Sequence, residues 1–193
     1  DAVVFEISCF KPDTTGAERL HDIAQEVGRV LGRFTFDDIS VESLSYGSPN
    51  VLVTSQLAEI HGVIKCLIHS KGFKPPWYVA PATLKKFVTG DGRAEKSDIK
   101  LAIYKRWGLE IRDNNKADAY GLAALCAAIA VEISAGLDYQ KECVKTVLKS
   151  PMNACRAQSP TTAVPLDDKL ILDAISVLDA ANVPPKKRFR KNG

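Results

Sequence analysis

The sequence has little of what would build a disulfide framework, a zinc site or a membrane anchor. Its five cysteines form no Cys-x-x-Cys pair, and its three histidines do not cluster with them at ligand spacing. We therefore expect reduced, buried thiols and no zinc. No uninterrupted run approaches the roughly 18 apolar residues that span a bilayer, and no signal-peptide pattern opens the chain. These absences predict a cytoplasmic protein whose partners include neither a membrane nor a small-molecule cofactor.

A large charge excess is also missing. The chain has 193 residues, 46% hydrophobic and 25% charged, with a formal net charge of +3. This composition fits one globular domain plus some extra chain. The charge is unevenly placed, because the last ten residues carry five Lys or Arg and no acidic side chain. Such a tail is expected to add nonspecific affinity for nucleic acid.

Hydrophobic periodicity predicts alternating strands and helices. A helix begins after Thr15, which we expect to act as its cap with Glu18 as capping-box partner, and it ends at Gly32. Strands are expected at 2–10, 39–44 and 77–80, and further helices at 53–70, 82–88, 97–107, 116–135, 138–149 and 167–181. This alternation favours an α/β sheet with parallel neighbours and covering helices.

The pattern weakens after Gly136. We therefore expect a main domain at 1–136, a helical extension joined by a flexible linker at 137–183, and the basic tail at 184–193. The extension is expected to have a role of its own.

Two carboxylates are candidates for chemistry. Glu42 lies inside a strand segment of otherwise apolar and small residues, where a charge is costly unless it meets a cation or a partner. Asp118 lies at the start of the long helix, just after Asp113, Asn114 and Asn115. Either carboxylate alone is more simply explained as a surface group or a helix cap. Together they offer the oxygen ligands that Mg²⁺ takes.

Five segments carry a family resemblance. They are TGAERLHDI (15–23), ISVESLSYG (39–47), LAEIHGVI (57–64), VAPATLKKFVTGDGRAEKSDI (79–99) and DNNKADAYGLAALC (113–126). In this order and spacing the sequence resembles the RuvC-type Holliday-junction resolvases, especially their phage-type members, over about residues 1 to 130. The resemblance implies an RNase H-like mixed sheet flanked by helices, and a metal-dependent endonuclease that cuts branched DNA in a bacterial cytoplasm.

The resemblance also assigns site residues. Glu42 matches the family's second catalytic acid and Asp118 its last, both as ligands of Mg²⁺, for which Mn²⁺ would substitute. Asn115 stands at a position where some relatives carry Asp or His, and Asp113 is the alternative. Lys96 matches a basic residue near the scissile phosphate, although a surface lysine would look the same.

Further DNA contacts are expected from basic and aromatic residues. Lys85 and Lys86 would bind the DNA backbone unless they form a solvated helix face, and Arg93 lies in the glycine loop after that helix. Tyr46 lies near an aromatic that stacks on unpaired bases in relatives, unless it is simply buried in a turn. The resemblance implies a homodimer as well, with the helix at 53–70 as candidate interface.

The family's first catalytic aspartate has no counterpart here, because the match begins at what is normally the third strand. Glu6 stands too close to Thr15 to take that place, so we expect further residues upstream and no DNA hydrolysis by residues 1–193 alone. Two other hypotheses stay open. One is a noncatalytic DNA-binding or scaffold protein, and the other is an RNase H-like nuclease with a different substrate.

Overall fold

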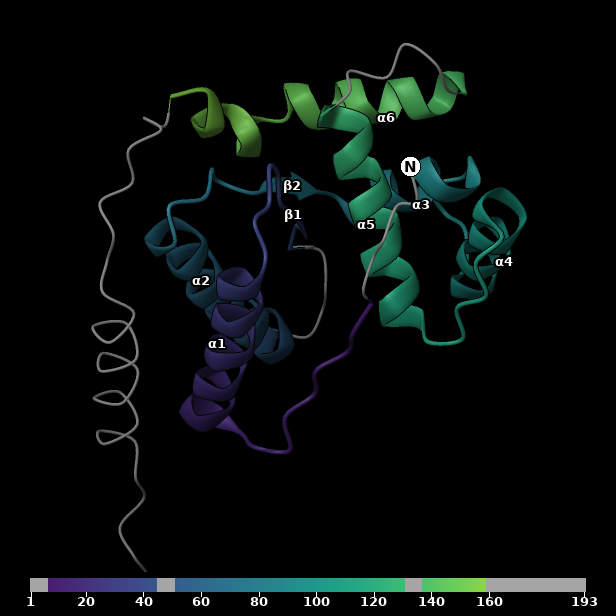
Figure 1. Ribbon diagram of the computed structural model, residues 1–193. Coiled ribbons are helices and arrows are strands. Elements are labelled where there is room, and N and C mark those ends of the chain that lie inside the picture. Colours follow the sequence, from purple (N-terminus) through teal and green to yellow (C-terminus); the bar gives the residue numbers. More distant parts are fainter. Residues whose placement is uncertain (1–6, 45–50, 131–136, 159–193) are drawn as a thin grey trace, which may run out of the picture.

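The computed structural model describes residues 7–44, 51–130 and 137–158. Two layers of helices enclose a small sheet (Figure 1). The elements are α1 (Gly16–Arg33), β1 (Ser40–Glu42), α2 (Val51–Ser70), β2 (Trp77–Val79), α3 (Pro81–Thr89), α4 (Lys96–Trp107), α5 (Asn114–Ala130), α6 (Asp138–Lys149) and the 3₁₀ helix η1 (Pro151–Gln158). Their order confirms the predicted alternation from 16 to 149.

The two strands are parallel neighbours, as predicted. Glu42 stands opposite Val79, and the amide of Ser43 donates to the Val79 carbonyl at 2.8 Å. The strand expected at 2–10 is not found at residues 7–10, and residues 1–6 lie outside the described part. Within the described residues the sheet therefore shows only its parallel part, and an antiparallel neighbour that would make it mixed is not seen.

Helices α1 and α2 cover one side of the sheet and share a small core of Ala24, Leu31, Leu67 and Ile68. The helix after Thr15 forms as expected, but the capping-box prediction is wrong, because the Thr15 side chain makes no capping hydrogen bond. Instead the Thr14 hydroxyl donates to Asp22 at 2.6 Å. This bond ties the segment before α1 to the second turn of the helix.

Helices α3 to α6 build the larger core on the other side. Leu84, Val88, Ile103 and Leu125 are almost completely buried there. Gly121 allows α5 to approach α3 closely, because a Cβ at this position would lie 2.9 Å from Val88 Cγ2 and 3.0 Å from Leu84 Cδ1. This close approach fixes the position of the whole α5 helix.

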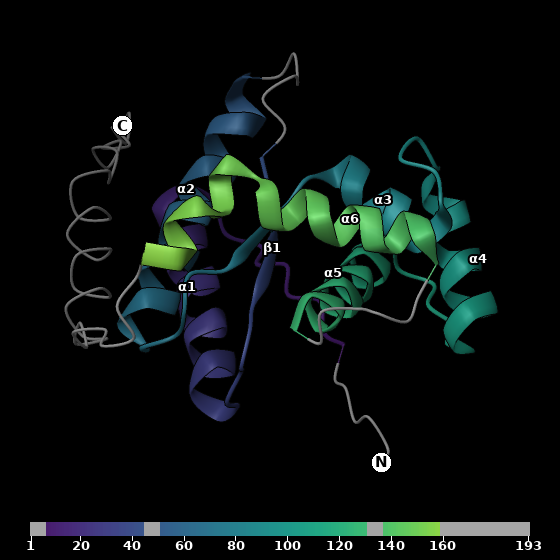
Figure 2. The same ribbon diagram turned by 90° about the horizontal axis from the view of Figure 1, so that it is seen from above.

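Helix α6, which the sequence pattern places in an extension, belongs to this larger core. It lies across α3 and α5 (Figure 2). Its buried side chains Cys143, Val144 and Val147 join the core cluster. Arg106 of α4 donates to the Phe87 carbonyl at 3.1 Å and also to the Tyr139 hydroxyl. Since burial here is as deep as in α3, the segment 137–149 does not act as a flexibly joined unit.

The cysteine prediction is correct only in part. Cys9, Cys66, Cys126 and Cys143 are free thiols, and the last two are buried. Cys9 and Cys66 are exposed, because residues 7–10 form no strand and Cys66 lies on the outer side of α2. The helix expected at 167–181 and the basic tail lie outside the described residues.

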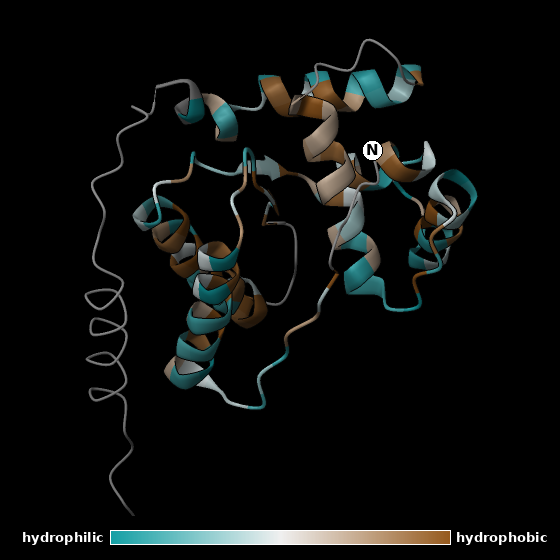
Figure 3. Cartoon of the chain, viewed as in Figure 1, coloured by the Kyte–Doolittle hydropathy of each residue, from teal (hydrophilic) through white to brown (hydrophobic). Residues whose placement is uncertain are grey.

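Helix α2 is more apolar than expected. In the described part of the chain it is the one helix long and apolar enough by composition to cross a membrane. Length and composition alone are weak evidence for a membrane span. Its apolar residues colour much of the helix brown in Figure 3, and its first half leaves Val51 79% and Leu52 67% exposed.

Candidate metal and phosphate site

Glu42 is placed by the end of β1. In a strand residues i and i+2 face the same side, so Glu42 points the same way as Ser40. The Ser40 hydroxyl donates to the Leu122 carbonyl of α5 at 3.0 Å. This bond ties the strand to α5 on the face that carries Glu42. The Glu42 side chain reaches solvent at the open end of the strand.

Asp118 is placed by the same contact. It lies four residues before Leu122, which is one turn along the same face of α5. The Glu42 and Asp118 carboxylates therefore come together, as the sequence predicts, and the charge of Asp118 acts directly on Glu42. Burial raises the pKa of Glu42, and repulsion by Asp118 raises it further. Burial likewise raises the pKa of Asp118.

Two lysines oppose this repulsion. The ammonium groups of Lys96 and Lys85 lower the pKa of both carboxyls, though less than burial raises it. Lys85 lies on α3, and Lys96 is the first residue of α4. A capping box formed by Glu95 and Asp98 fixes that helix start. The site thus unites two carboxylates and two ammonium groups from four elements.

The turn between α3 and α4 holds the two lysines in place. Gly90 ends α3 with φ 94°, a left-handed conformation that glycine adopts without strain. Its amide donates to the Lys86 carbonyl at 2.8 Å. The Thr89 hydroxyl and the Asp91 backbone bond each other in the same turn. The Glu95 capping box was not among the sequence predictions, although Glu95 and Asp98 stand three residues apart before an apolar pattern, which is its signature.

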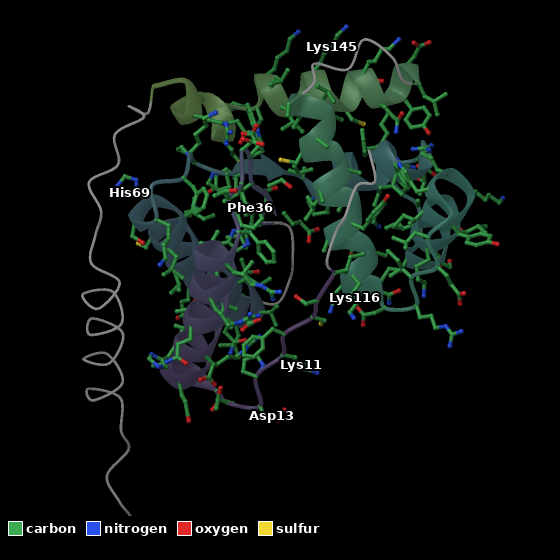
Figure 4. The ribbon with its side chains drawn as sticks, viewed as in Figure 1. Lys11, Asp13, Phe36, His69, Lys116 and Lys145 are labelled. Atoms are coloured by element: carbon green, nitrogen blue, oxygen red, sulfur yellow. The ribbon has the colours of Figure 1, made fainter. Side chains whose placement is uncertain are left out.

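The start of α5 offers further oxygen atoms that could bind a cation, but the best-placed residue differs from the one expected. Asp113 is exposed, and its Oδ1 accepts the Lys116 amide at 2.9 Å, so it caps α5. Asn115, the preferred candidate, is exposed. Asn114 instead has a buried Oδ1 without a hydrogen-bond partner. It lies four residues before Asp118, on the same helix face. Lys116, which lies in the same first turn of α5, is labelled in Figure 4.

The remaining candidates lie apart from the carboxylates or outside the described residues. Lys86 turns to α6 and pairs with Glu142 at 2.9 Å, because successive helix residues point about 100° apart. Arg93 is exposed in the turn, where its amide bonds Asp91. Tyr46 falls outside the described residues.

A divalent cation fits the donor set at this site. Carboxylate and amide oxygens are hard donors, and a cation would relieve the repulsion that raises the pKa of Glu42. In residues 7–44, 51–130 and 137–158 no three His, Cys, Asp or Glu converge on one point. The fold and the site together define an α/β protein with a paired-carboxylate site flanked by lysines.

Comparisons with known proteins give this class a family. The profile of the family described as Crossover junction endodeoxyribonuclease RuvC matches residues 3–132. The chain therefore belongs to the RuvC family.

Individual relatives carry the same description. The Crossover junction endodeoxyribonuclease RuvC of Corynebacterium glutamicum is 31% identical over 114 residues, which are 58% of this chain and 51% of that protein. That of Syntrophomonas wolfei is 30% identical over 122 residues, covering 62% and 69%. The chain thus spans about half the length of the C. glutamicum relative.

Solved structures agree on the fold. The Thermus thermophilus RuvC structure matches with a TM-score of 0.54 and 25% identity, over 66% of this chain and 76% of that one. T. thermophilus RuvC in complex with Holliday junction substrate matches with a TM-score of 0.52 and 23% identity, over 59% and 69%. The α/β fold with RNase H-like topology is therefore shared.

Proposed function

We propose that this protein is a structure-specific DNA endonuclease that cuts branched DNA such as Holliday junctions by phosphodiester hydrolysis, with Mg²⁺ as its natural ion. The observation that carries the proposal is the pairing of Glu42 and Asp118 beside Lys85 and Lys96. Family membership and the junction-bound T. thermophilus relative support the substrate class. The bacterial relatives fit a cytoplasmic place of action.

Glu42 and Asp118 would hold the cation, with the buried amide oxygen of Asn114 or that of Asn115 beside them. When bound, Mg²⁺ supplies charge that activates water and stabilises the leaving oxygen. The two carboxylates would fix the position of the cation, because Glu42 is held by the sheet and Asp118 by α5. Asp113 is engaged as a helix cap, which makes it the weaker candidate ligand.

Lys96 and Lys85 would bind the oxygen atoms of the scissile phosphate. Their ammonium groups already act on both carboxyls, so a phosphate bound there would stand beside the acids. Arg93 and Tyr46 stay candidate contacts, to DNA backbone and unpaired base respectively. Lys86 would contact DNA only after breaking its pair with Glu142.

A homodimer is part of this proposal. The first half of α2 exposes Val51, Leu52, Val53 and Leu57. An exposed apolar face of this kind is typical of a protein interface. A dimer would present two such sites to the two symmetric strands of a junction. The predicted helical extension at 137–183 stays an expectation for the part beyond residue 158, which lies outside the described residues.

A second candidate is a DNA-binding protein without nuclease activity. It is favoured by one observation, that only two carboxylates meet in the described part of the site. Such a protein would bind junctions through the same lysines and would not cleave them.

The test is cleavage of a synthetic four-way junction by the full gene product in Mg²⁺ and in Mn²⁺. We expect cutting by the wild type, and binding without cutting by Glu42→Gln, since the amide keeps the shape and loses the charge. Cutting by Glu42→Gln at the wild-type rate would contradict the site assignment. Binding without cutting by the wild type would favour the noncatalytic candidate.

A further inference from the structure

An exposed aromatic patch lies where α1 and α2 both end. It consists of Phe34, Phe36 and Phe73, and Figure 4 labels Phe36. The rings of Phe34 and Phe36 are 6.1 Å apart between centroids, and those of Phe36 and Phe73 are 5.8 Å apart. Phe34 is 39% and Phe36 36% exposed. Phe73 is half-buried against the α1–α2 core, so the patch presents two exposed rings on a third, an apolar surface of the kind that proteins use for association.

The patch has a positive rim. The Arg33 guanidinium lies 5.0 Å from the centre of the Phe34 ring. Lys71 reaches across to Gly32, and Lys74 is exposed beside Phe73. The rim also contains two acids. Asp37 is exposed, whereas Asp38 is paired with Arg156. The rim therefore brings the cations Arg33, Lys71 and Lys74 together with the carboxylates of Asp37 and Asp38.

The described chain ends beside this patch. Arg156 in η1 pairs with Asp38 and donates to the Pro75 carbonyl. Asp38 stands two residues after Phe36, and Pro75 two residues after Phe73. The seven residues 159–165 can span at most about 25 Å when extended, so a segment that begins at residue 166 is close enough to reach the patch.

Segment 166–181 is complementary to the patch in charge and in apolar pattern. It contains four aspartates and one lysine, a net charge of −3 (1 − 4). Its apolar residues recur at helical spacing, at Leu170, Ala174, Val177, Leu178 and Ala181. An acidic amphipathic helix is the kind of element that an aromatic patch with a cationic rim would bind.

We propose that segment 166–181 docks as an amphipathic helix on the aromatic patch of its own chain. A second exposed apolar surface, on the first half of α2, fits this segment less well. It begins at Val51, about 28 Å along the helix from Ser70, and Glu59 lies beside it. The docked helix would extend the smaller core and bury Phe34 and Phe36. This inference does not depend on the proposed nuclease activity.

The test uses an amine-reactive cross-linker on the full chain, because Lys169 is the only lysine between residues 150 and 185. We expect Lys169 to be joined mainly to Lys71 or Lys74. In a mixture of isotopically heavy and light protein these products should be purely heavy or purely light. In Phe36→Ser their yield should fall about tenfold, the change given by about 1.4 kcal/mol.

Leu57→Ser is the matched control, since Leu57 is 43% exposed on the first half of α2, and it should leave the products unchanged. The double substitution Leu170→Ser with Leu178→Ser tests the same contact without altering the patch, and should give the same loss as Phe36→Ser. Cross-links spread evenly over lysines of α4 and α6, products joining heavy to light chains, or products that survive the double substitution would each overturn the proposal.

Discussion

The two sides of the sheet are packed very differently. In the described residues, the cluster built by α3 to α6 and Val79 of β2 has thirteen buried members, whereas the cluster between α1 and α2 has four. Three of the four charged groups of the candidate site, Lys85, Lys96 and Asp118, stand on the densely packed side. The fourth, Glu42, stands on the strand between the two sides.

This difference separates two roles. Groups that must be held within fractions of an ångström are best placed on elements locked by packing, and α3, α4 and α5 provide that. The α1–α2 side, in contrast, keeps apolar surface available for association. We propose two occupants for that surface, a second copy on the first half of α2 and segment 166–181 on the aromatic patch.

The largest effect is expected from removing a core leucine on each side. Leu84 and Leu67 are 2% and 3% exposed. We expect Leu84→Ala to lower the free energy of unfolding by about 3–5 kcal/mol and Leu67→Ala by about 2–3 kcal/mol, because the small core can collapse around its cavity more readily. Urea unfolding of the two variants measures both. An equal or larger loss in Leu67→Ala would remove the contrast.

A pair of glycines sharpens the comparison. A Cβ at Gly121 would lie closer to Val88 and Leu84 than van der Waals contact allows, at 2.9 Å and 3.0 Å. A Cβ at Gly62 on α2 would have no heavy atom within 4 Å. Gly121→Ala should therefore lose about 1 kcal/mol despite its gain in helix propensity, and Gly62→Ala should gain about 0.5–1 kcal/mol. Stabilisation by both substitutions would show that α5 is not closely packed.

The carboxylates give a pH-dependent effect without metal. Since the folded pKa of Glu42 is raised above its ordinary 4.5, its contribution favours folding at low pH and is lost as pH rises through the folded pKa. Glu42→Gln should therefore have a higher melting temperature than the wild type at pH 7 in a chelator. The gap should close as pH falls toward about 4.5. A lower melting temperature at pH 7 would indicate that Glu42 is a stabilising ion-pair partner instead.

The smallest expected effect is a difference between two adjacent lysines in the salt dependence of DNA binding. Lys85 faces the carboxylates, whereas Lys86 pairs with Glu142. In metal-free junction binding, Lys85→Gln should reduce the slope of log affinity against log salt by about one, and Lys86→Gln should leave it unchanged. The same change in both variants would mean that the pair with Glu142 opens on DNA.

Most elements could be located from the sequence because their apolar residues recur at helical or strand spacing and end at glycine or proline. The membership of α6 in the core could not, since Cys143, Val144 and Val147 alternate with lysines and only packing on α3 shows their burial. Within the site, the family resemblance pointed to Glu42 and Asp118, and their proximity is shown by the effect of Asp118 on Glu42, while their role as ligands stays a prediction. Which side chain near 113–115 is exposed, and which caps α5, depends on backbone geometry that spacing does not contain.

The most direct test of the paired-carboxylate site is a titration of the full chain with Mn²⁺. Binding is monitored through the electron paramagnetic resonance signal of the free ion. We expect a saturable site in the wild type whose affinity falls at least about tenfold in Glu42→Gln and in Asp118→Asn, since each removes one charged oxygen ligand. Glu110→Gln is the control and should bind as the wild type does, because this exposed carboxylate pairs with Arg112 at 3.1 Å and is not a candidate ligand. Equal affinity in the wild type, Glu42→Gln and Asp118→Asn would contradict the paired-carboxylate site.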